Sequence, residues 1–200
     1  IKTSSIKSRR HAKLKAKKNK SNTIIGFNNG ACLTTGVRNV FLGRSAGLGV
    51  TTGDCNFYVG NHAGPSLCGH KGSANIALGN NAMRSSPASS TASNNVMLGQ
   101  SAGQYNNASN NIFLGLCAGR NNDTGASNVF MGCLTGIGNS TGGANIYIGQ
   151  QSGPQTCGAT GCYNVVLGKG AGSSITSGTK NIAIGCEAGK CLTTNFGTIT

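Results

Sequence analysis

The sequence predicts an all-β protein, a parallel β-solenoid or β-roll of about ten coils that associates as a homotrimer. Three observations predict it: a phrase that recurs ten times, three successive apolar residues in each copy, and small residues at fixed positions afterwards. One copy runs from Asn39 to Gly47 and consists of an asparagine, three apolar residues, a glycine, two variable residues, a small residue and a second glycine. Such a short, regular period is typical of repeat proteins whose stacked units share one core.

The repeat divides the 200 residues into three parts. We expect a basic arm at residues 1–21, the ten-coil solenoid at residues 22–191, and a cap or a linker to a further segment at residues 192–200. The glycines that follow the apolar triplets are 16 to 20 residues apart. The 33 glycines and the low charge content would by themselves indicate low complexity, but the fixed register indicates an ordered repeat.

The basic arm carries nine of the 17 Lys and Arg residues and none of the three acidic residues. Such a run is typical of a solvated tail or of a contact with an acidic polymer. Because no Phe, Tyr or Trp accompanies the charges, we expect the arm to dock onto a larger assembly rather than onto nucleic acid. The docking residues are Lys7, Arg9, Arg10, Lys13, Lys15, Lys17 and Lys18.

Each apolar triplet, such as Val40-Phe41-Leu42, predicts a strand with two buried faces, because alternate side chains of a strand point to opposite sides. We expect the outer two residues to fill the coil and the middle residue to point outward. Closed cyclic symmetry is the usual way to bury such an outward stripe, so a trimer is predicted; a monomer whose loops cover the stripe is the alternative. The predicted oligomer interface is Phe41, Tyr58, Met97, Phe113, Phe130 and Tyr147.

The first residue of the phrase is an asparagine in all ten copies. This predicts a structural ladder in which each side-chain amide bonds to the next coil, as amides do in stacked sheets. The alternative is that asparagine only favours the entry to a turn. The ladder residues are Asn22, Asn39, Asn56, Asn75, Asn95, Asn111, Asn128, Asn145, Asn164 and Asn181.

Three coils are longer than the others, and they contain all three prolines. Insertions in a solenoid bulge from one face, which is often the binding face. Residues 65–73, 85–93 and 154–161 are therefore predicted contact loops for a partner, with a spacer role as the alternative.

In an oxidising environment nine cysteines predict disulfides, with at least one thiol left over. Two candidates lie one register step apart on adjacent coils, and two further pairs would each close a short loop. The alternative is that these cysteines are small buried apolar side chains. The disulfide candidates are Cys117, Cys133, Cys157, Cys162, Cys186 and Cys191.

The residue inventory argues against an enzyme. The acids Asp54, Asp123 and Glu187 lie at different repeat positions, whereas glycoside hydrolysis needs paired carboxylates. The cluster of His62, Cys68 and His70 lacks a fourth ligand at zinc spacing. We therefore expect no catalytic residue, no metal and no cofactor. The apolar runs are too short to cross a membrane, so no membrane insertion is expected.

The phrase resembles the head repeat of the trimeric autotransporter adhesins, the YadA-like family, and also the longer repeats of phage and algal-virus fibres. The resemblance covers residues 22–191 and rests on the asparagine, the apolar triplet, the glycine and the Ala-Gly pair. It implies a left-handed parallel β-roll that trimerises at a virion or cell surface. The longer coils, the nine cysteines and the lack of a coiled-coil stalk or membrane anchor depart from the bacterial family.

Together these observations predict a non-enzymatic structural or attachment fibre module, located at a virion surface or outside a cell. Its expected partners are copies of itself, other structural proteins of the assembly, and a host surface glycan. Two alternatives stay open: an architectural filament or virion component without a receptor, and a virion protein that binds nucleic acid through the arm.

Overall fold

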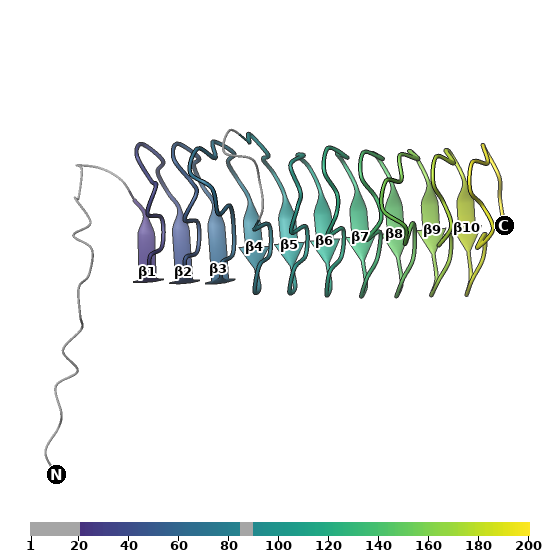
Figure 1. Ribbon diagram of the computed structural model, residues 1–200, viewed down its shortest axis with the longest axis horizontal. Coiled ribbons are helices and arrows are strands. Elements are labelled where there is room, and N and C mark those ends of the chain that lie inside the picture. The colour runs from purple at the N-terminus through teal and green to yellow at the C-terminus, as the bar shows by residue number, and fades with distance from the viewer. Residues whose placement is uncertain (1–20, 85–89) are drawn as a thin grey trace, which may run out of the picture.

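The computed structural model describes residues 21–84 and 90–200, and in them the chain winds into one solenoid with ten strands (Figure 1). Each strand opens one coil, and we number the coils by their strands. The strands are β1 (Thr23–Phe27), β2 (Val40–Arg44), β3 (Phe57–Asn61), β4 (Ile76–Leu78), β5 (Val96–Leu98), β6 (Ile112–Leu114), β7 (Val129–Met131), β8 (Ile146–Ile148), β9 (Val165–Leu167) and β10 (Ile182–Ile184).

The strands form one ten-stranded parallel sheet in which every strand pairs with the next one along the chain. The register repeats without slippage, so that Phe113 pairs with Phe130 and Phe130 with Tyr147. The order from β1 to β10 is the order of the colours along the axis in Figure 1. The predicted fold class, an all-β parallel solenoid of about ten coils, is confirmed.

The orientation predicted for the triplets is wrong. The middle residues lie inside the coil and are fully buried within a single chain: Phe41, Tyr58, Met97, Phe113, Phe130 and Tyr147 are each 0% exposed. Their rings stack from coil to coil, with centroids 4.8 Å apart for Phe113–Phe130 and for Phe130–Tyr147. The outer residues of each triplet point out of the coil instead.

The reason for this orientation lies in the chain segment opposite the strand. In coil 2 the Ala-Gly pair leaves space for one large ring: Ala46 is fully buried, and a Cβ on Gly47 would lie 2.6 Å from the ring of Phe41. Close packing favours a large side chain against small ones in a layer. In coil 4 the sizes are exchanged, because the middle residue is Ala77 and the buried Met83 stands in place of the glycine.

The glycine that follows each triplet makes a corner: β4 to β10 end just before it, and β1 to β3 end one residue after it. These glycines have φ angles between +128° and +138°, a conformation that glycine alone adopts readily. At Gly149 a Cβ would also lie 2.6 Å from the carbonyl oxygen of Gly168 in the next coil. Both the backbone angle and the coil-to-coil spacing therefore require glycine at the corner.

The chain after Cys191 continues the stack. Leu192 fills the interior and is 7% exposed. Thr200 N donates to Ile182 O at 2.9 Å, and Ile184 N donates to Thr200 O at 2.9 Å. Residues 192–200 therefore cover the edge of β10. The basic arm, apart from Ser21, lies outside the described residues, and so do residues 85–89 of one contact loop.

Candidate functional site

The outward face of the sheet carries two apolar rows that run along the whole solenoid. They consist of the first and third residues of the triplets. Their exposure differs between coils: Ile112, Ile146 and Ile148 are each 39% exposed and Ile184 is 59% exposed, whereas Val40 and Leu42 are partly buried. The two rows, called the outer stripe below, form a regular apolar band over the sheet from β2 to β10. Sequence reasoning had placed them in the core.

The ten asparagines form a continuous chain of hydrogen bonds through the solenoid. The Oδ1 atom of each accepts a bond from the backbone N–H at the same position in the next coil, as in Asn164 N to Asn145 Oδ1 at 2.9 Å. The series starts with Asn39 N to Asn22 Oδ1 at 2.8 Å and ends with Thr198 N to Asn181 Oδ1 at 2.9 Å.

The Nδ2 atoms of most ladder asparagines satisfy a second buried group. Asn145 Nδ2 donates to Gly161 O at 2.8 Å, and Asn164 Nδ2 donates to Gly178 O at 2.8 Å. Both asparagines are fully buried, and burial without such partners would be costly. One side chain thus joins two coils and also closes its own coil.

A second ladder, two residues before the first, was not predicted. Ser73 Oγ accepts from Asp54 N at 2.9 Å, and Ser93 Oγ accepts from Ser73 N at 3.0 Å. Asp54 Oδ1 accepts from Val37 N at 2.7 Å. At the equivalent position Cys162 Sγ accepts from Gly143 N at 3.3 Å. Because the residue type at this position changes between coils, no residue pattern in the sequence indicates this ladder. Only its fixed distance from the asparagine does.

A third set of buried side chains lies at equivalent positions of neighbouring coils, and in coils 5 to 7 its members are the asparagines Asn106, Asn122 and Asn139. Asn122 Nδ2 donates to Asn106 Oδ1 at 2.6 Å, and Asn139 Nδ2 donates to Asn122 Oδ1 at 2.7 Å. Asn139 pairs with Ala159, and so its Oδ1 is left without a partner. His70 pairs with Val50 at the corresponding position. Neither ring nitrogen of His70 has a partner, and burial lowers its pKa to about 4.

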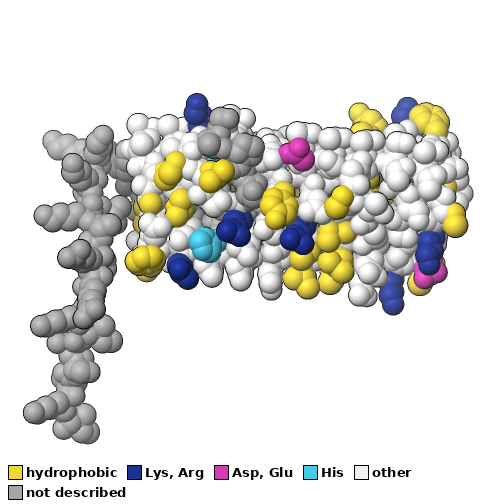
Figure 2. Space-filling model, in the orientation of Figure 1, with side chains coloured by type: hydrophobic (Ala, Val, Ile, Leu, Met, Phe, Trp, Pro, Cys, Tyr) yellow, Lys and Arg dark blue, Asp and Glu magenta, His cyan; other side chains and the backbone are white. Residues whose placement is uncertain are grey.

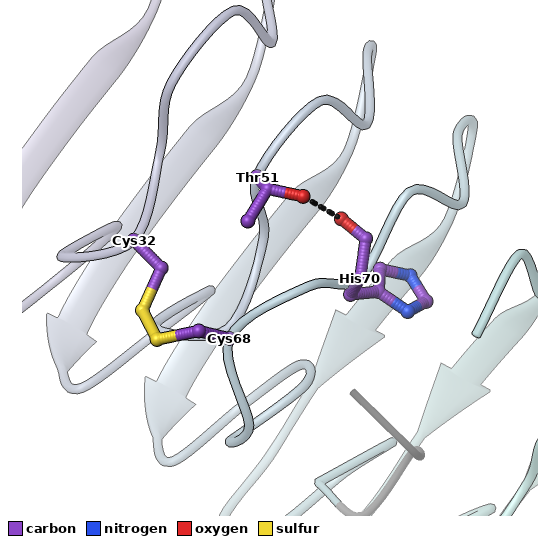
Figure 3. The surroundings of a disulfide bond; sticks show 4 residues. All are labelled: Cys32, Thr51, Cys68 and His70. Atoms are coloured by element: carbon purple, nitrogen blue, oxygen red, sulfur yellow. Dashed lines mark hydrogen bonds between the residues drawn. A yellow bond between two sulfur atoms is a disulfide. The ribbon is translucent and has the colours of Figure 1, made fainter. Parts of the chain in front are cut away.

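The disulfide lies elsewhere than predicted. Cys32 in coil 1 is bonded to Cys68 in coil 3, with Cα atoms 5.5 Å apart (Figure 3). The longer coil 3 reaches back over coil 2, where Gly49 N donates to Pro65 O at 2.8 Å. None of the six candidates is paired within the part of the chain that the structure describes: Cys117, Cys133, Cys157, Cys162, Cys186 and Cys191 are all free.

Coil 8 repeats the geometry of coil 3 at a distance of 89 residues. Gly138 N donates to Pro154 O at 2.9 Å, as Gly49 does to Pro65 in the earlier coil. Cys157 lies 89 residues after Cys68, and Asn121 lies 89 residues after Cys32. Asn121 Nδ2 donates to Cys157 Sγ at 3.2 Å. The same two-coil reach is thus closed by a disulfide in one half and by a hydrogen bond in the other.

The predicted contact loops are partly exposed. In residues 65–73, Leu67 is 55% exposed, whereas Pro65 is buried. In residues 154–161, Thr156, Cys157 and Gly158 are exposed. In Figure 3 the ring of His70 points away from the disulfide, and the backbone oxygen of His70 accepts from Thr51 Oγ1 at 3.0 Å.

The residues considered for catalysis and metal binding are dispersed. Asp54 accepts a hydrogen bond from Val37 N, and Asp123 accepts one from Asn107 Nδ2 at 2.6 Å. Glu187 forms an ion pair with Lys190 at 3.4 Å. Cys68 is in the disulfide. Residues 21–84 and 90–200 contain no group of three or more His, Cys, Asp or Glu side chains that could hold a metal ion. In the same residues no helix is long and apolar enough to cross a membrane.

The described residues therefore form a parallel β-solenoid with an apolar outer stripe. Ladders of buried asparagine side chains connect its coils. Comparisons of the chain with models of known protein families, with curated proteins and with solved structures found no match.

Proposed function

We propose that the protein is a non-enzymatic fibre module, displayed at a virion surface or outside a cell, in which three copies of the solenoid pack side by side. The observation that carries the proposal is the outer stripe, which is apolar from β2 to β10 and partly exposed in the single chain. Soluble monomers rarely expose contiguous apolar patches of such extent.

The free energy to be gained from covering the stripe is substantial. Burying the rest of a half-exposed isoleucine contributes on the order of 1 kcal/mol. Both outer side chains are exposed in β8 and β10, one of the two is exposed in β3, β4, β6 and β7, and those of β2, β5 and β9 are partly buried. Summed along the rod, this exceeds the several kcal/mol that association costs in lost translational and rotational freedom.

Two parallel rows suit a three-fold arrangement. Around a three-fold axis each solenoid touches two neighbours, so that the first residues of the triplets can face one copy and the third residues the other. The resemblance to the head repeats of trimeric surface adhesins and of phage and algal-virus fibres supports the same arrangement, with left-handed coils. The contact residues are the outer ones of each triplet rather than the buried aromatic ones.

The fibre role follows from the proposed assembly. Ten coils at ~4.8 Å each give a rod roughly 5 nm long, and the buried ladders make its coils hard to separate. The basic arm would dock the rod on an acidic surface of the larger assembly. The exposed parts of the contact loops, around Leu67 and Cys157, would face the surroundings of the particle.

The mass of the full chain in solution tests the proposal. Light scattering on the unmodified chain is expected to give three times the chain mass. Ile112→Asp puts a charge into the outer stripe and is expected to yield monomers. Leu116→Asp is the matched control, because Leu116 is also apolar and 45% exposed but lies past the glycine corner.

Circular dichroism of both variants would verify that the solenoid still forms. If the unmodified chain is found to be monomeric, the trimer is excluded and the fibre role loses its main support. Equal effects of the two substitutions would show that the outer stripe is not the interface.

A further inference from the structure

Three cationic side chains and one histidine lie together on one face of the solenoid without acidic partners among the described residues. They are Arg44, His62, Arg84 and Arg120, and we call them, with Tyr105, the anion surface. Figure 2 shows cationic side chains and a histidine along this side, with the visible acidic side chains elsewhere. In residues 21–84 and 90–200 the only ion pair is Lys190 with Glu187.

The members of the anion surface are close enough to affect one another. Burial and then the charges of Arg84 and Arg44 lower the pKa of His62. Arg120 lies over the ring of Tyr105, with its guanidinium carbon 5.7 Å from the ring centroid. Its Nε donates to Gln104 Oε1 at 3.3 Å. Like charges held together without a counter-charge raise the energy of the free protein, and an anion would relieve it.

Next to these charges the surface is hollowed. The hollow has a volume of about 260 Å³ and is lined by Ser66, Leu67, Arg84, Gln104 and Tyr105. That is below the range of pockets for drug-sized ligands and suits one sugar ring. Tyr105 is 39% exposed and offers an aromatic face, while Ser66 and Gln104 offer polar groups beside it.

The arginines recur along the axis at every second coil: Arg44 is in coil 2, Arg84 in coil 4 and Arg120 in coil 6. With ~4.8 Å between neighbouring strands, successive arginines are about 10 Å apart along the axis. This spacing favours a linear polymer with charges on alternate units. Single-stranded nucleic acid carries a charge on every unit and needs a series of stacking aromatic side chains, and the surface has one.

We propose that the anion surface binds a linear acidic polysaccharide that bears carboxylate or sulfate groups, with one sugar ring in the hollow against Tyr105. Arg84 and Arg120 flank that ring, and Arg44 binds an anionic group further along the polymer. Guanidinium groups bind both carboxylates and sulfate-like anions through paired N–H donors. The inference rests on the proposed function, because it names the ligand of the displayed fibre.

The hollow and the arginines beside it lie outside the outer stripe. Arg84, Tyr105 and Arg120 come from the segments that return after the glycine corners, five or six residues beyond the corner glycine, whereas Arg44 is the last residue of β2 and borders the stripe. Association of copies through the strands therefore leaves the hollow, Arg84 and Arg120 open to a ligand.

The test uses the full chain and two probes, a sulfated hexasaccharide and a polyuronate hexasaccharide. Residues 1–21 bind any polyanion to some extent, so the readout must be local. The imidazole of His62 provides it, because its NMR titration reports charge at the anion surface alone. The signal is assigned with His62→Gln, and both probes are added at physiological salt.

We expect at least one probe to raise the pKa of His62 by about one unit, as an opposite charge nearby does. The double variant Arg44→Gln, Arg84→Gln is expected to weaken binding of that probe at least tenfold, since each lost charge-assisted bond costs about 1.5 kcal/mol or more. Lys169→Gln, Lys180→Gln removes the same charge from coil 9 and is expected to leave binding unchanged.

The outcome with the sulfated and the uronate probe identifies which anionic group is preferred. An unchanged His62 titration with both probes would overturn the inference, and so would equal effects of the two double variants. Single-stranded DNA that binds as tightly and shifts His62 as much would also overturn it. None of these results alters the mass of the assembly, so failure here is distinguishable from failure of the proposed fibre.

Discussion

The asparagine ladder makes a sharp prediction about stability at Asn145 in coil 8. Its Oδ1 accepts from the backbone N–H of Asn164 at 2.9 Å, and its Nδ2 donates to Gly161 O at 2.8 Å. Asn145→Ala removes these bonds and a third one, which Asn164 Nδ2 donates to Asn145 Oδ1 at 3.1 Å, and it leaves a buried N–H and a buried C=O without these partners. Each orphaned group costs about 1–3 kcal/mol, so the substitution is expected to lower the free energy of unfolding by about 2–6 kcal/mol.

The assay is denaturant unfolding followed by circular dichroism, at one protein concentration because the proposed assembly would make stability concentration-dependent. Asn80→Ala is the control: Asn80 is exposed, and surface substitutions of this kind stay within about 0.5 kcal/mol. If Asn145→Ala costs no more than Asn80→Ala, the ladder contributes nothing and the argument fails.

Asn145→Asp adds a pH dependence to the same test. The new carboxylate would face the carbonyl oxygen of Gly161, which disfavours the charged form and raises the folded-state pKa above the ordinary value of about 3.9. A raised acid pKa means that stability is present below the unfolded pKa and is lost as pH rises through the folded one. The variant is therefore expected to be more stable at pH 4 than at pH 7, relative to Asn145→Ala.

Three further predictions follow from other positions. Asn121→Cys, in oxidising buffer, is expected to form a disulfide with Cys157, so that mass spectrometry after alkylation finds one free thiol fewer than in the unmodified chain although the variant has one cysteine more. Gly149→Ala is expected to cost about 2 kcal/mol or more, because it adds a clash with the next coil to the strain of a positive φ; thermal unfolding measures this. For His70, whose folded pKa is lowered from 6.5 to about 4, the unfolded chain binds more protons between these values. Stability is therefore expected to fall by about 2 kcal/mol from pH 7.5 to pH 5, and His70→Val to remove that part of the loss.

Each of these has a matched comparison. Asn121→Ser keeps a small polar side chain and should leave the thiol count of Cys157 unchanged. Gly158→Ala keeps the strain of a positive φ, yet its Cβ would meet nothing within 4 Å, so a loss as large as that of Gly149→Ala would exclude the clash as the cause. An acid sensitivity that persists in full in His70→Val would show that other groups cause it.

The fold could be predicted because the repeat fixes its own register. Ten asparagines followed after four residues by ten glycines define where each coil begins and where its strand ends. Parallel pairing of adjacent coils then follows, since consecutive coils of one solenoid run in the same direction. The strand positions were determined by this spacing rather than by the propensity of any one triplet.

The inner face of each strand could not be predicted from the triplets alone. Both faces are apolar, so the alternation in a strand gives two equivalent answers. What decides between them is the volume opposite the strand, where Ala118 and Gly119 leave space for the ring of Phe113. Weighing residue size across the coil, rather than polarity along the strand, would have given the observed orientation.

The turn conformations and the disulfide could not be predicted from the sequence either. Leu134 and Tyr163 adopt φ angles of +57° and +59°, which their residue types disfavour. They do so because the coil must close in register with its neighbours. Cys32 and Cys68 are 36 residues apart and meet because coil 3 folds back over coil 2, which depends on the path of one long loop.

The bond between Cys32 and Cys68 has a mechanical consequence. A pull on the first coil of a solenoid peels coils away one at a time, and each released coil lengthens the chain. Here the disulfide prevents the chain between its two cysteines, which are 36 residues apart, from extending. That segment would add about 12 nm of extended chain. The chain between Cys32 and Cys68, which includes β2 and β3, therefore resists force as one block in the oxidised protein, and its coils separate one at a time only when the bond is reduced.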